Sequence, residues 1–265
     1  MDLGGKTALL SGATGGIGRA IAEALAGRGA HVVVSSRKRE ALDELAAALP
    51  GDGHRVLVAD LAEQGAAERL VGEAGEVDVL VANAGLPGSG KLDSFSQEEI
   101  GRALRVNLEA PIRMTRELLP AFRERGSGHF VYVSSLSGKI ASPRTSIYAA
   151  TKFGLRGFAL ALREDLRTTP IGASVVLPGF IRDAGMFADS GAKPPPGLGT
   201  STPHEVAAGV LSAIEDDRGE VQVAPRVQRL LAGFAHRRPE LAGRIQQRGG
   251  AKIADEVARG QTDKR

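Results

Sequence analysis

The sequence contains no cysteine and no tryptophan, and only 4% of its 265 residues are aromatic. Without cysteine the chain cannot form disulfides, thiolate metal sites or a cysteine nucleophile. No apolar run approaches the roughly 18 residues that a membrane-spanning helix requires. The first residues, Met1–Lys6, lack the basic and apolar regions of a signal peptide, so the expected location is the cytoplasm.

Glycine, by contrast, is abundant, with 35 residues, and the chain is 42% hydrophobic and 25% charged. This is the composition of an ordinary folded protein, and the length predicts one domain or at most two. Many glycines with few aromatic residues favour an α/β protein with tight turns between strands and helices over an aromatic-rich β-sandwich.

Charge is distributed unevenly along the chain. Residues 218–265 carry 11 basic and 5 acidic side chains, whereas the rest of the chain carries 23 basic and 26 acidic ones. The basic character therefore belongs to the tail. Since a dedicated nucleic-acid binder would also have a basic face on its body, we expect no nucleic-acid partner.

Short apolar β-branched runs alternate with longer stretches of helical period. The candidate strands are Thr7–Leu10, Val32–Val34, Val56–Ala59, Val77–Val81, His129–Val133, Ala173–Leu177 and Glu220–Val223. The candidate helices are Gly16–Gly29, Arg39–Leu49, Glu63–Glu73, Gln97–Arg125, Tyr148–Thr168 and Pro203–Glu215. Strict alternation predicts a doubly wound parallel α/β sheet with helices on both faces, because parallel strands are covered on both sides.

Two segments depart from this alternation, and they divide the chain into a domain over 1–224 and an extension over 225–265. A loop over 183–202, rich in proline and glycine, follows a strand end, where α/β sheets bind ligands. It is interpreted as a mobile substrate lid; the alternative is a disordered connection.

The basic extension has apolar residues at helical spacing, with Pro239 at a helix start. These residues are Leu230, Leu231, Phe234, Leu241 and Ile245. One interpretation is a solvated helix pair packed on the body or on a neighbouring subunit. The other is docking to an anionic membrane or an acidic partner, for which the candidate residues are Arg237, Arg238, Arg244 and Arg248.

A glycine-rich turn joins the first strand to the first helix. Glycines permit positive φ and close approach of a ligand to the backbone, and the helix N-terminus offers free N–H groups to a pyrophosphate. A purely structural turn is the alternative. The candidate phosphate-binding residues are Ser11, Gly12, Thr14, Gly15, Gly16, Ile17 and Gly18.

The second strand ends in Ser36, followed by Arg37. An acidic residue here would bind the adenosine ribose hydroxyls and repel a 2′-phosphate, whereas a guanidinium can pair with that phosphate. The sequence therefore favours NADP(H) over NAD(H); a solvated basic helix start is the alternative.

Tyr148 and Lys152 stand four residues apart, on one face of a predicted helix. A free phenol titrates near ~10, and a neighbouring cation would lower that pKa toward the range useful for proton transfer. By itself the pair could arise by chance on a helix surface. The only other tyrosine, Tyr132, lies inside a predicted strand.

The glycine spacing of Gly12, Gly16 and Gly18 resembles that of the short-chain dehydrogenase/reductase family in its single-domain branch, with Ser11 in place of the usual threonine. With the motifs Asn83-Ala84-Gly85, Ser135, Tyr148–Lys152 and Pro178-Gly179, the resemblance covers about residues 5–223. It implies a Rossmann-type sheet of about seven strands and reversible hydride transfer between the nicotinamide and a carbonyl or secondary alcohol. It also implies a homodimer or homotetramer.

The same resemblance implies four catalytic residues. Ser135, which lies 13 residues before Tyr148, would bind the carbonyl oxygen, and Tyr148 would transfer the proton. Lys152 would tune that phenol and bind the nicotinamide ribose. Asn107 would anchor a water that connects the lysine to solvent, although an asparagine within a helix can simply face water. Ser134 and Ser137 are alternatives to Ser135.

Further cofactor contacts are implied at strand ends. They are Asp60, Leu61, Asn83, Ala84, Gly85, Pro178, Gly179 and Ile181, together with Tyr148 and Lys152. The chain departs from the family pattern at Asp183, which replaces a threonine that contacts the carboxamide. An ionised carboxylate can accept a hydrogen bond from that amide but cannot donate one, which places this contact in doubt.

The substrate is the least determined feature. The expected wall residues are mostly apolar and favour a small to mid-sized ketone, aldehyde or secondary alcohol; they are Leu86, Leu136, Thr145, Phe180, Met186 and Phe187. Five scattered histidines imply no metal. Two alternatives remain: a non-catalytic NADP(H)-binding sensor, and an epimerase or dehydratase on the same fold.

Overall fold

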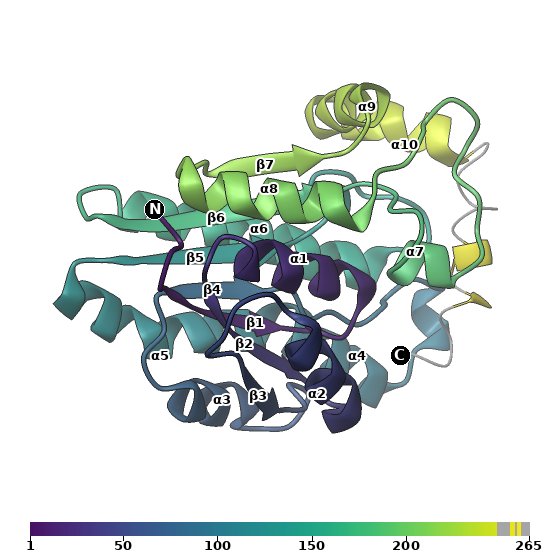
Figure 1. The fold of residues 1–265 in the computed structure, drawn as a ribbon. Helices are drawn as coiled ribbons and strands as arrows, with labels where there is room; N and C mark the ends of the chain where they lie inside the picture. Colours follow the sequence, from purple (N-terminus) through teal and green to yellow (C-terminus); the bar gives the residue numbers. More distant parts are fainter. Residues whose placement is uncertain (248–254, 258, 261–265) are drawn as a thin grey trace.

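A computed structural model describes residues 1–247, 255–257 and 259–260 of the chain. Seven parallel strands form one sheet, as the sequence predicts, and their order is β3-β2-β1-β4-β5-β6-β7 (Figure 1). The strands are β1 Thr7–Ser11, β2 His31–Ser36, β3 Arg55–Val58, β4 Val79–Ala82, β5 Gly128–Val133, β6 Ile171–Pro178 and β7 Glu220–Val223. The chain reverses its direction across the sheet between β1 and β4, and in such sheets ligands bind beyond the carboxyl ends of the strands at this switch.

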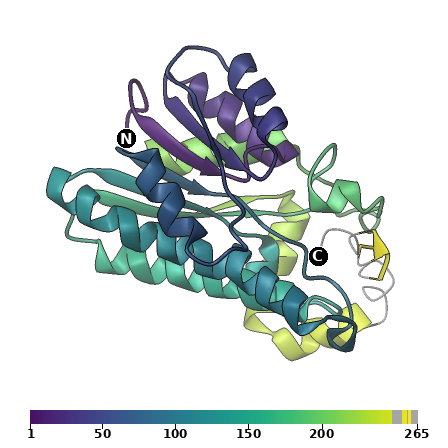
Figure 2. The same cartoon turned by 90° about the horizontal axis from the view of Figure 1, so that it is seen from below.

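Helices cover both faces of the sheet (Figures 1 and 2). They are α1 Gly16–Ala26, α2 Arg39–Ala48, α3 Ala66–Ala74, α4 Gln97–Leu104, α5 Ala110–Arg125, α6 Ser146–Asp165, α7 Met186–Asp189, α8 Pro203–Glu215, α9 Arg226–Arg237 and α10 Pro239–Gln247. One core unites α1, α2 and α8 through residues such as Ile21, Leu42 and Val210. The other unites α3, α5 and α6 through Leu70, Met114 and Leu155, and α9 joins it through Ala232.

The predicted helix over Gln97–Arg125 is interrupted by a π-helical turn, Arg105–Glu109. The N–H of Ala110 bonds to the carbonyl of Arg105, five residues back. Pro111 is the physical reason, because it has no N–H for the carbonyl of Asn107 and its ring clashes with that carbonyl in a regular helix. The continuous helix was therefore wrong in its centre.

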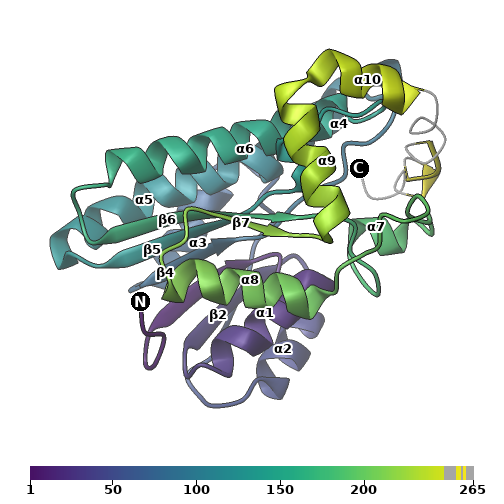
Figure 3. The ribbon, with the colours of Figure 1, turned by 90° about the horizontal axis from the view of Figure 1, so that it is seen from above.

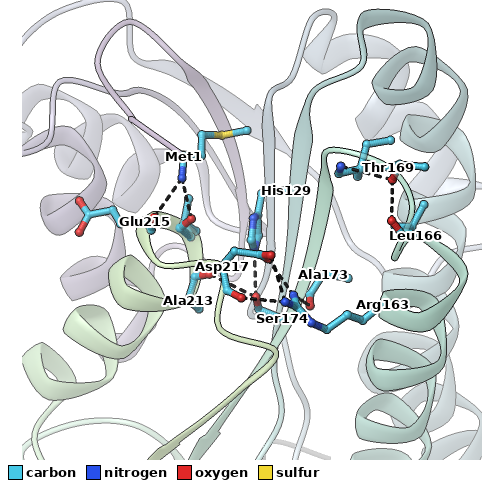
Figure 4. A network of polar contacts seen from close by, with 12 residues as sticks. Met1, His129, Arg163, Leu166, Thr169, Ala173, Ser174, Ala213, Glu215 and Asp217 are labelled. Atoms are coloured by element: carbon cyan, nitrogen blue, oxygen red, sulfur yellow. Dashed lines mark hydrogen bonds and ion pairs between the residues drawn. The ribbon is translucent and has the colours of Figure 1, made fainter.

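At the amino ends of β5 and β6 lies a polar cluster in which His129 and Ser174 are buried, while Arg163 and Asp217 are partly exposed (Figure 4). His129 Nε2 lies 2.8 Å from Ser174 Oγ, which donates to the carbonyl of Ala213. Arg163 makes two hydrogen bonds to the Asp217 carboxylate, 2.8 and 3.0 Å long. The cluster, which we call the amino-edge cluster, thus pairs nearly every polar group that it buries.

The loop over 183–202 contains one short helix, α7, and its ends are tied by a bridge between Ile181 and Ser201. The extension beyond β7 forms α9 and α10, which lie at the upper right of the molecule in Figures 1 and 3, and α9 packs on the core that contains α6. Within the part of the chain that the structure describes, no helix is both long and apolar enough to cross a bilayer.

Candidate active site

The turn between β1 and α1 is packed so closely that side chains at Gly12 and Gly18 would clash with neighbouring backbone. Gly12 adopts φ of +67°, and a Cβ there would stand 2.7 Å from the Cα of Ala84. A Cβ on Gly18 would stand 2.1 Å from the Gly12 carbonyl oxygen. Both positions therefore require glycine, and Gly18 allows the close approach of helix and turn that the sequence predicts.

Ser11 and Asn83 join this turn to the end of β4. The Ser11 hydroxyl accepts hydrogen bonds from the N–H groups of Asn83 and Ala84, both at 3.2 Å. The Asn83 amide donates to the carbonyls of Ser11 and Gly12 at 3.2 and 3.1 Å. A hydroxyl is thus what position 11 needs, which explains why serine can stand where threonine is usual.

The N-terminus of α1 opens at this turn. Its cap, Gly15, has no side chain, and no described side chain caps the first turn of the helix. The first N–H groups of a helix have no partner within the helix and carry its positive dipole end. Thr14, Gly16 and Ile17 border this position, so the turn fits a pyrophosphate.

The ends of β2 and β3 lie beside the turn, where an adenosine ribose would follow the pyrophosphate. Ser36 is half-buried at the end of β2, and Arg37 is exposed. Among the described residues the Arg37 guanidinium has no hydrogen-bond or ion-pair partner, so it is free to donate hydrogen bonds to a phosphate. Asp60 accepts a hydrogen bond from the Ala62 N–H at 2.9 Å, and the neighbouring Leu61 is buried.

Tyr148 and Ser135 meet between α6 and the end of β5. Ser135 begins a 3₁₀ turn over Leu136–Gly138, and its hydroxyl accepts from the N–H of Ser137 at 3.1 Å. Burial raises the pKa of Tyr148, and its hydrogen bond with Ser135 opposes that rise. A phenol above its usual pKa is held in the protonated form, which is the form that a proton donor needs.

This pKa differs from our expectation. We expected Lys152 to lower the pKa of Tyr148, yet burial dominates and raises it. The lysine Nζ lies 5.7 Å from the centre of the tyrosine ring, over its face. The physical reason is that desolvation of the phenolate outweighs the favourable interactions present.

Lys152 is buried, with 3% of its surface exposed, and its Nζ donates to the carbonyl of Val133 at 3.1 Å. No carboxylate pairs with it among the described residues, and burial lowers its pKa to about 8. An ammonium group has three donors, so a buried one with a single acceptor has capacity left for hydroxyl groups. The ribose of a bound nicotinamide nucleotide offers that chemistry.

Asn107 is fully buried on the π-helical turn and does not face water. Its Oδ1 accepts from the N–H of Leu86 at 2.6 Å, and its Nδ2 donates to the carbonyl of Leu86 at 2.9 Å. Nδ2 also lies 3.3 Å from the hydroxyl of Thr151, beside Lys152. The side chain thus fixes the segment after β4 against α6.

Ser134 and Ser137 do not share the position of Ser135. The buried Ser134 hydroxyl donates to the carbonyl of Lys152 at 2.9 Å, so it anchors α6. Ser137 presents its N–H to Ser135. The structure therefore brings Ser135, and neither alternative, to the Tyr148 hydroxyl.

The predicted substrate residues come from three segments. Leu86 and Leu136 are buried, and the rings of Phe180 and Phe187 pack together with centroids 4.6 Å apart. The hydroxyl of Thr145 donates to the Ser142 carbonyl at 2.7 Å, so it is already engaged.

The 183–202 loop lies directly on the nucleotide-binding turn. The Ala184 Cβ is 2.1 Å from where a Cβ on Gly16 would stand, and Met186 Cε is 3.2 Å from the corresponding position on Gly85. Gly179 and the buried Pro178 and Ile181 lead into this loop.

Asp183 does not reach the site in this arrangement. It adopts φ of +71°, its carboxylate is largely exposed, and it lies 3.4 Å from Arg182 Nε. The expected contact of this side chain with a carboxamide therefore has no support in the geometry.

Two residues near the site escaped the sequence analysis. Gln228 of α9 donates to the carbonyl of Gly199 at 2.9 Å and accepts from the Phe180 N–H at 3.3 Å, so it ties both ends of the loop to α9. Asp255 pairs with Arg144, four residues before Tyr148, at 2.8 Å. No local sequence pattern predicts either contact, because each joins segments far apart in the chain. The only available signal was a glutamine among the small residues on the buried face of α9.

Comparisons with known proteins agree with this geometry. Residues 6–194 match the family model described as short chain dehydrogenase. Among curated proteins the chain is 38% identical over 227 residues to a ketoacyl reductase, HetN, of Nostoc sp., covering 83% of this chain and 79% of that protein. It is 33% identical over 182 residues to a 3-oxoacyl-[acyl-carrier-protein] reductase, FabG, of Rickettsia conorii, covering 69% and 75%.

Solved structures give the same result. A short-chain dehydrogenase from Sphingobium yanoikuyae in complex with NADPH superposes with a TM-score of 0.78 at 27% identity, over 89% of this chain and 94% of that one. The closed form of a serine dehydrogenase complexed with NADP⁺ gives 0.74 at 28% identity, over 83% and 95%. Fold and site thus define a nicotinamide-dependent oxidoreductase that acts on CH–OH and C=O groups. The chain belongs to the short-chain dehydrogenase/reductase family.

Proposed function

We propose that the protein transfers hydride reversibly between NADP(H) and the carbonyl/alcohol pair of a small to mid-sized apolar substrate. The observation that carries this proposal is the convergence of Ser135, Tyr148 and the buried Lys152, with which no carboxylate among the described residues pairs, at the carboxyl edge of the sheet. The bound nicotinamide supplies the hydride. Everything else in the reaction is positioning and proton transfer by this chain.

In the direction of reduction, the Ser135 hydroxyl holds the carbonyl oxygen of the substrate beside the Tyr148 phenol. Tyr148 donates its proton to that oxygen as negative charge develops on it. Lys152 stabilises the phenolate that results and binds the ribose hydroxyls. As the family resemblance implies, Asn107 anchors a water through which a proton returns from solvent toward the lysine and the tyrosine.

NADP(H) is favoured over NAD(H) because Arg37 is an exposed guanidinium without a partner among the described residues, at the strand end where the ribose 2′ position would lie. Two structural neighbours, one complexed with NADP⁺ and one with NADPH, support the same cofactor. The family resemblance also supports a homodimer or homotetramer, for which the exposed Leu104 and Phe153 on α4 and α6 are candidate contacts.

The relatives suggest where a substrate search should begin. Since HetN and FabG are named as ketoacyl and 3-oxoacyl reductases, 3-oxoacyl thioesters head a panel that includes simple ketones, aldehydes and secondary alcohols. The apolar walls formed by Leu86, Leu136, Phe180 and Phe187 suit an acyl chain.

The test is a change of nicotinamide absorbance over this panel, with NADPH and NADH compared under identical conditions. We expect turnover with NADPH and loss of nearly all of it in Tyr148→Phe, which keeps cofactor binding because the ring remains. A Tyr148→Phe variant that turns over at the parent rate would overturn the assignment. Binding of NADPH without turnover of any substrate would favour the sensor alternative.

A further inference from the structure

Helix α9 shows its large apolar residues to solvent. Val227, Leu230, Leu231 and Phe234 follow the spacing i, i+3, i+4 and i+7, which places them along one side of the helix. They are between 40% and 74% exposed, with Leu230 the most exposed. We call these four residues the apolar stripe.

The face that α9 buries is made of other residues. Gln228, Ala232 and Ala235 point into the protein, and Gln228 bonds to the loop described above. A surface helix normally places its large apolar side chains against the core. In α9 small residues and a glutamine take that position, so the apolar stripe remains available for a contact outside the described fold.

Arginines run beside the apolar stripe. Arg226, Arg229 and Arg237 are exposed and share the adjoining side of the helix, and α9 contains no acidic residue. None of the three has an ion-pair partner among the described residues. An apolar side flanked by unpaired arginines is the pattern of a helix that lies in the plane of an anionic lipid surface.

Helix α9 lies where a lipid surface could approach it without steric hindrance from other described elements. In Figure 3, α9 and α10 lie at the front of the molecule, with no other labelled element across α9. Leu241 of α10 is 49% exposed, and Arg238 and Arg244 accompany it. The second helix thus extends the same combination of apolar and basic side chains.

Charge distinguishes the possible occupants of this surface. If two copies of the chain met through α9 around a two-fold axis, each would bring its arginines against those of the other, and like charges across a contact are unfavourable. Anionic headgroups complement the arginines and leave the acyl region for the apolar stripe. We therefore propose that α9 docks the protein on an anionic lipid surface, with Leu230 and Phe234 as its principal apolar anchors.

This proposal goes beyond the oxidoreductase function and does not depend on it. It has a structural consequence, however, because Gln228 on the inner side of α9 holds the segments on both sides of the substrate loop, through Phe180 and Gly199. The helix that we propose to contact lipid is thus also the helix that holds the 183–202 loop beside the site.

The first experiment sediments the full chain with vesicles of phosphatidylcholine alone or mixed with phosphatidylserine. We expect partitioning onto the mixed vesicles only, decreasing as salt is raised, because surface charges are screened. If the two vesicle compositions bind the chain equally, or neither binds it, the proposal is wrong.

Variants then separate the two components of the contact. In Leu230→Ser/Phe234→Ser we expect at least about tenfold weaker partitioning, since two apolar side chains no longer leave water. Leu92→Ser, another exposed leucine, is the matched control and should partition like the parent. Because these side chains are exposed, the thermal midpoint and NADPH binding should not change in either variant.

For the charges, Arg229→Gln/Arg237→Gln should weaken partitioning about 25-fold, at roughly fivefold for each arginine near the surface. Arg116→Gln/Arg123→Gln on α5 removes the same charge elsewhere and should have little effect. If it weakens binding equally, net charge and not α9 is responsible.

Two further outcomes would also overturn the proposal. A change of oligomeric state in Leu230→Ser/Phe234→Ser, measured by light scattering, would make the apolar stripe a subunit interface. Binding of soluble poly-glutamate as tightly as mixed vesicles, insensitive to the same variant, would show a purely electrostatic surface. Neither result bears on turnover, so this proposal and the proposed function can fail separately.

Discussion

The two edges of the sheet both hold titratable groups, but these groups differ in whether they have partners. At the amino edge, His129 is hydrogen-bonded to Ser174, and Arg163 is hydrogen-bonded to Asp217 (Figure 4). At the carboxyl edge, Lys152 has one backbone carbonyl, and Arg37 has no partner among the described residues. A buried charge without an ionic partner costs stability, and an exposed one such as Arg37 is free to bind an anion. Groups without partners therefore indicate where a ligand completes the contacts, whereas satisfied groups indicate structure.

The largest effect should come from Lys152→Met. We expect about a 10³-fold loss of kcat, because the phenolate and the ribose lose their cation. The thermal midpoint should stay the same or rise, since the variant no longer buries an ammonium group without a carboxylate. Activity assays together with thermal unfolding check both parts.

Lys139→Met is the matched control, because Lys139 is a half-buried lysine that does have a partner, Glu220, at 2.8 Å. It should lower the thermal midpoint and leave kcat nearly unchanged. If Lys152→Met instead destabilises the protein as Lys139→Met does, the contrast between paired and unpaired groups disappears.

His129 should make stability depend on pH. Burial lowers its pKa to about 4, against an ordinary value of 6.5, and the charge of Asp217 opposes that shift. The unfolded chain therefore binds more protons below pH 6.5, and stability is lost as the pH falls from 6.5 to 4. The loss attributable to this residue should reach about 3 kcal/mol.

The measurement compares denaturant unfolding of the parent and of His129→Gln at several pH values. The free energy of unfolding of the parent minus that of the variant should fall by about this amount as the pH is lowered across the window, whatever its value at neutral pH. His236→Gln on the exposed side of α9 should follow the parent throughout. A parallel pair of curves for the parent and His129→Gln would show that the histidine does not carry the dependence.

These buried groups also show how far the sequence could be read. The seven strands and the turn at Gly12 and Gly18 were predictable, because apolar runs and glycine spacing are local signals. Pro111 four residues after Asn107 was an available sign of the π-helical turn, which the continuous helical period concealed. The burial of Lys152 and the rise in the pKa of Tyr148 were not predictable, because they depend on packing around α6.

The contacts of the extension had no local signal at all. The pairing of Asp255 with Arg144 and the hydrogen bonds of Gln228 join the tail to segments that precede it by dozens of residues. Of the arginines proposed for membrane docking, Arg237, Arg238 and Arg244 are exposed, while Arg248 lies outside the described residues, as does the side chain of Ile245.

Arg37 extends the comparison to an exposed charge without a partner. Arg37→Ser should raise the KM for NADPH about tenfold or more and leave that for NADH nearly unchanged, because one charged hydrogen-bond partner of the 2′-phosphate is lost. The thermal midpoint should not move. Arg39→Ser, two residues on and 3.7 Å from Asp43, is the control and should change neither KM. Equal effects on both cofactors would remove the argument for NADP(H).

The smallest effect belongs to the ion pair at the amino edge. The hydrogen bonds of Arg163 lower the pKa of Asp217, so its contribution is present above the usual carboxyl pKa and is lost as the pH falls below it. Both side chains are partly exposed, so we expect Asp217→Asn to cost only about 1 kcal/mol at neutral pH, with kcat unchanged.

Asp183→Asn is its matched control at the other edge. Both aspartates adopt positive φ, which asparagine tolerates, so neither substitution adds backbone strain. Asp183 makes one longer contact to Arg182 in an exposed position, and its replacement should leave the free energy of unfolding unchanged. If Asp183→Asn lowers the free energy of unfolding more than Asp217→Asn does, the carboxyl edge holds a structural ion pair. The distinction between the two edges would then not hold for these exposed aspartates.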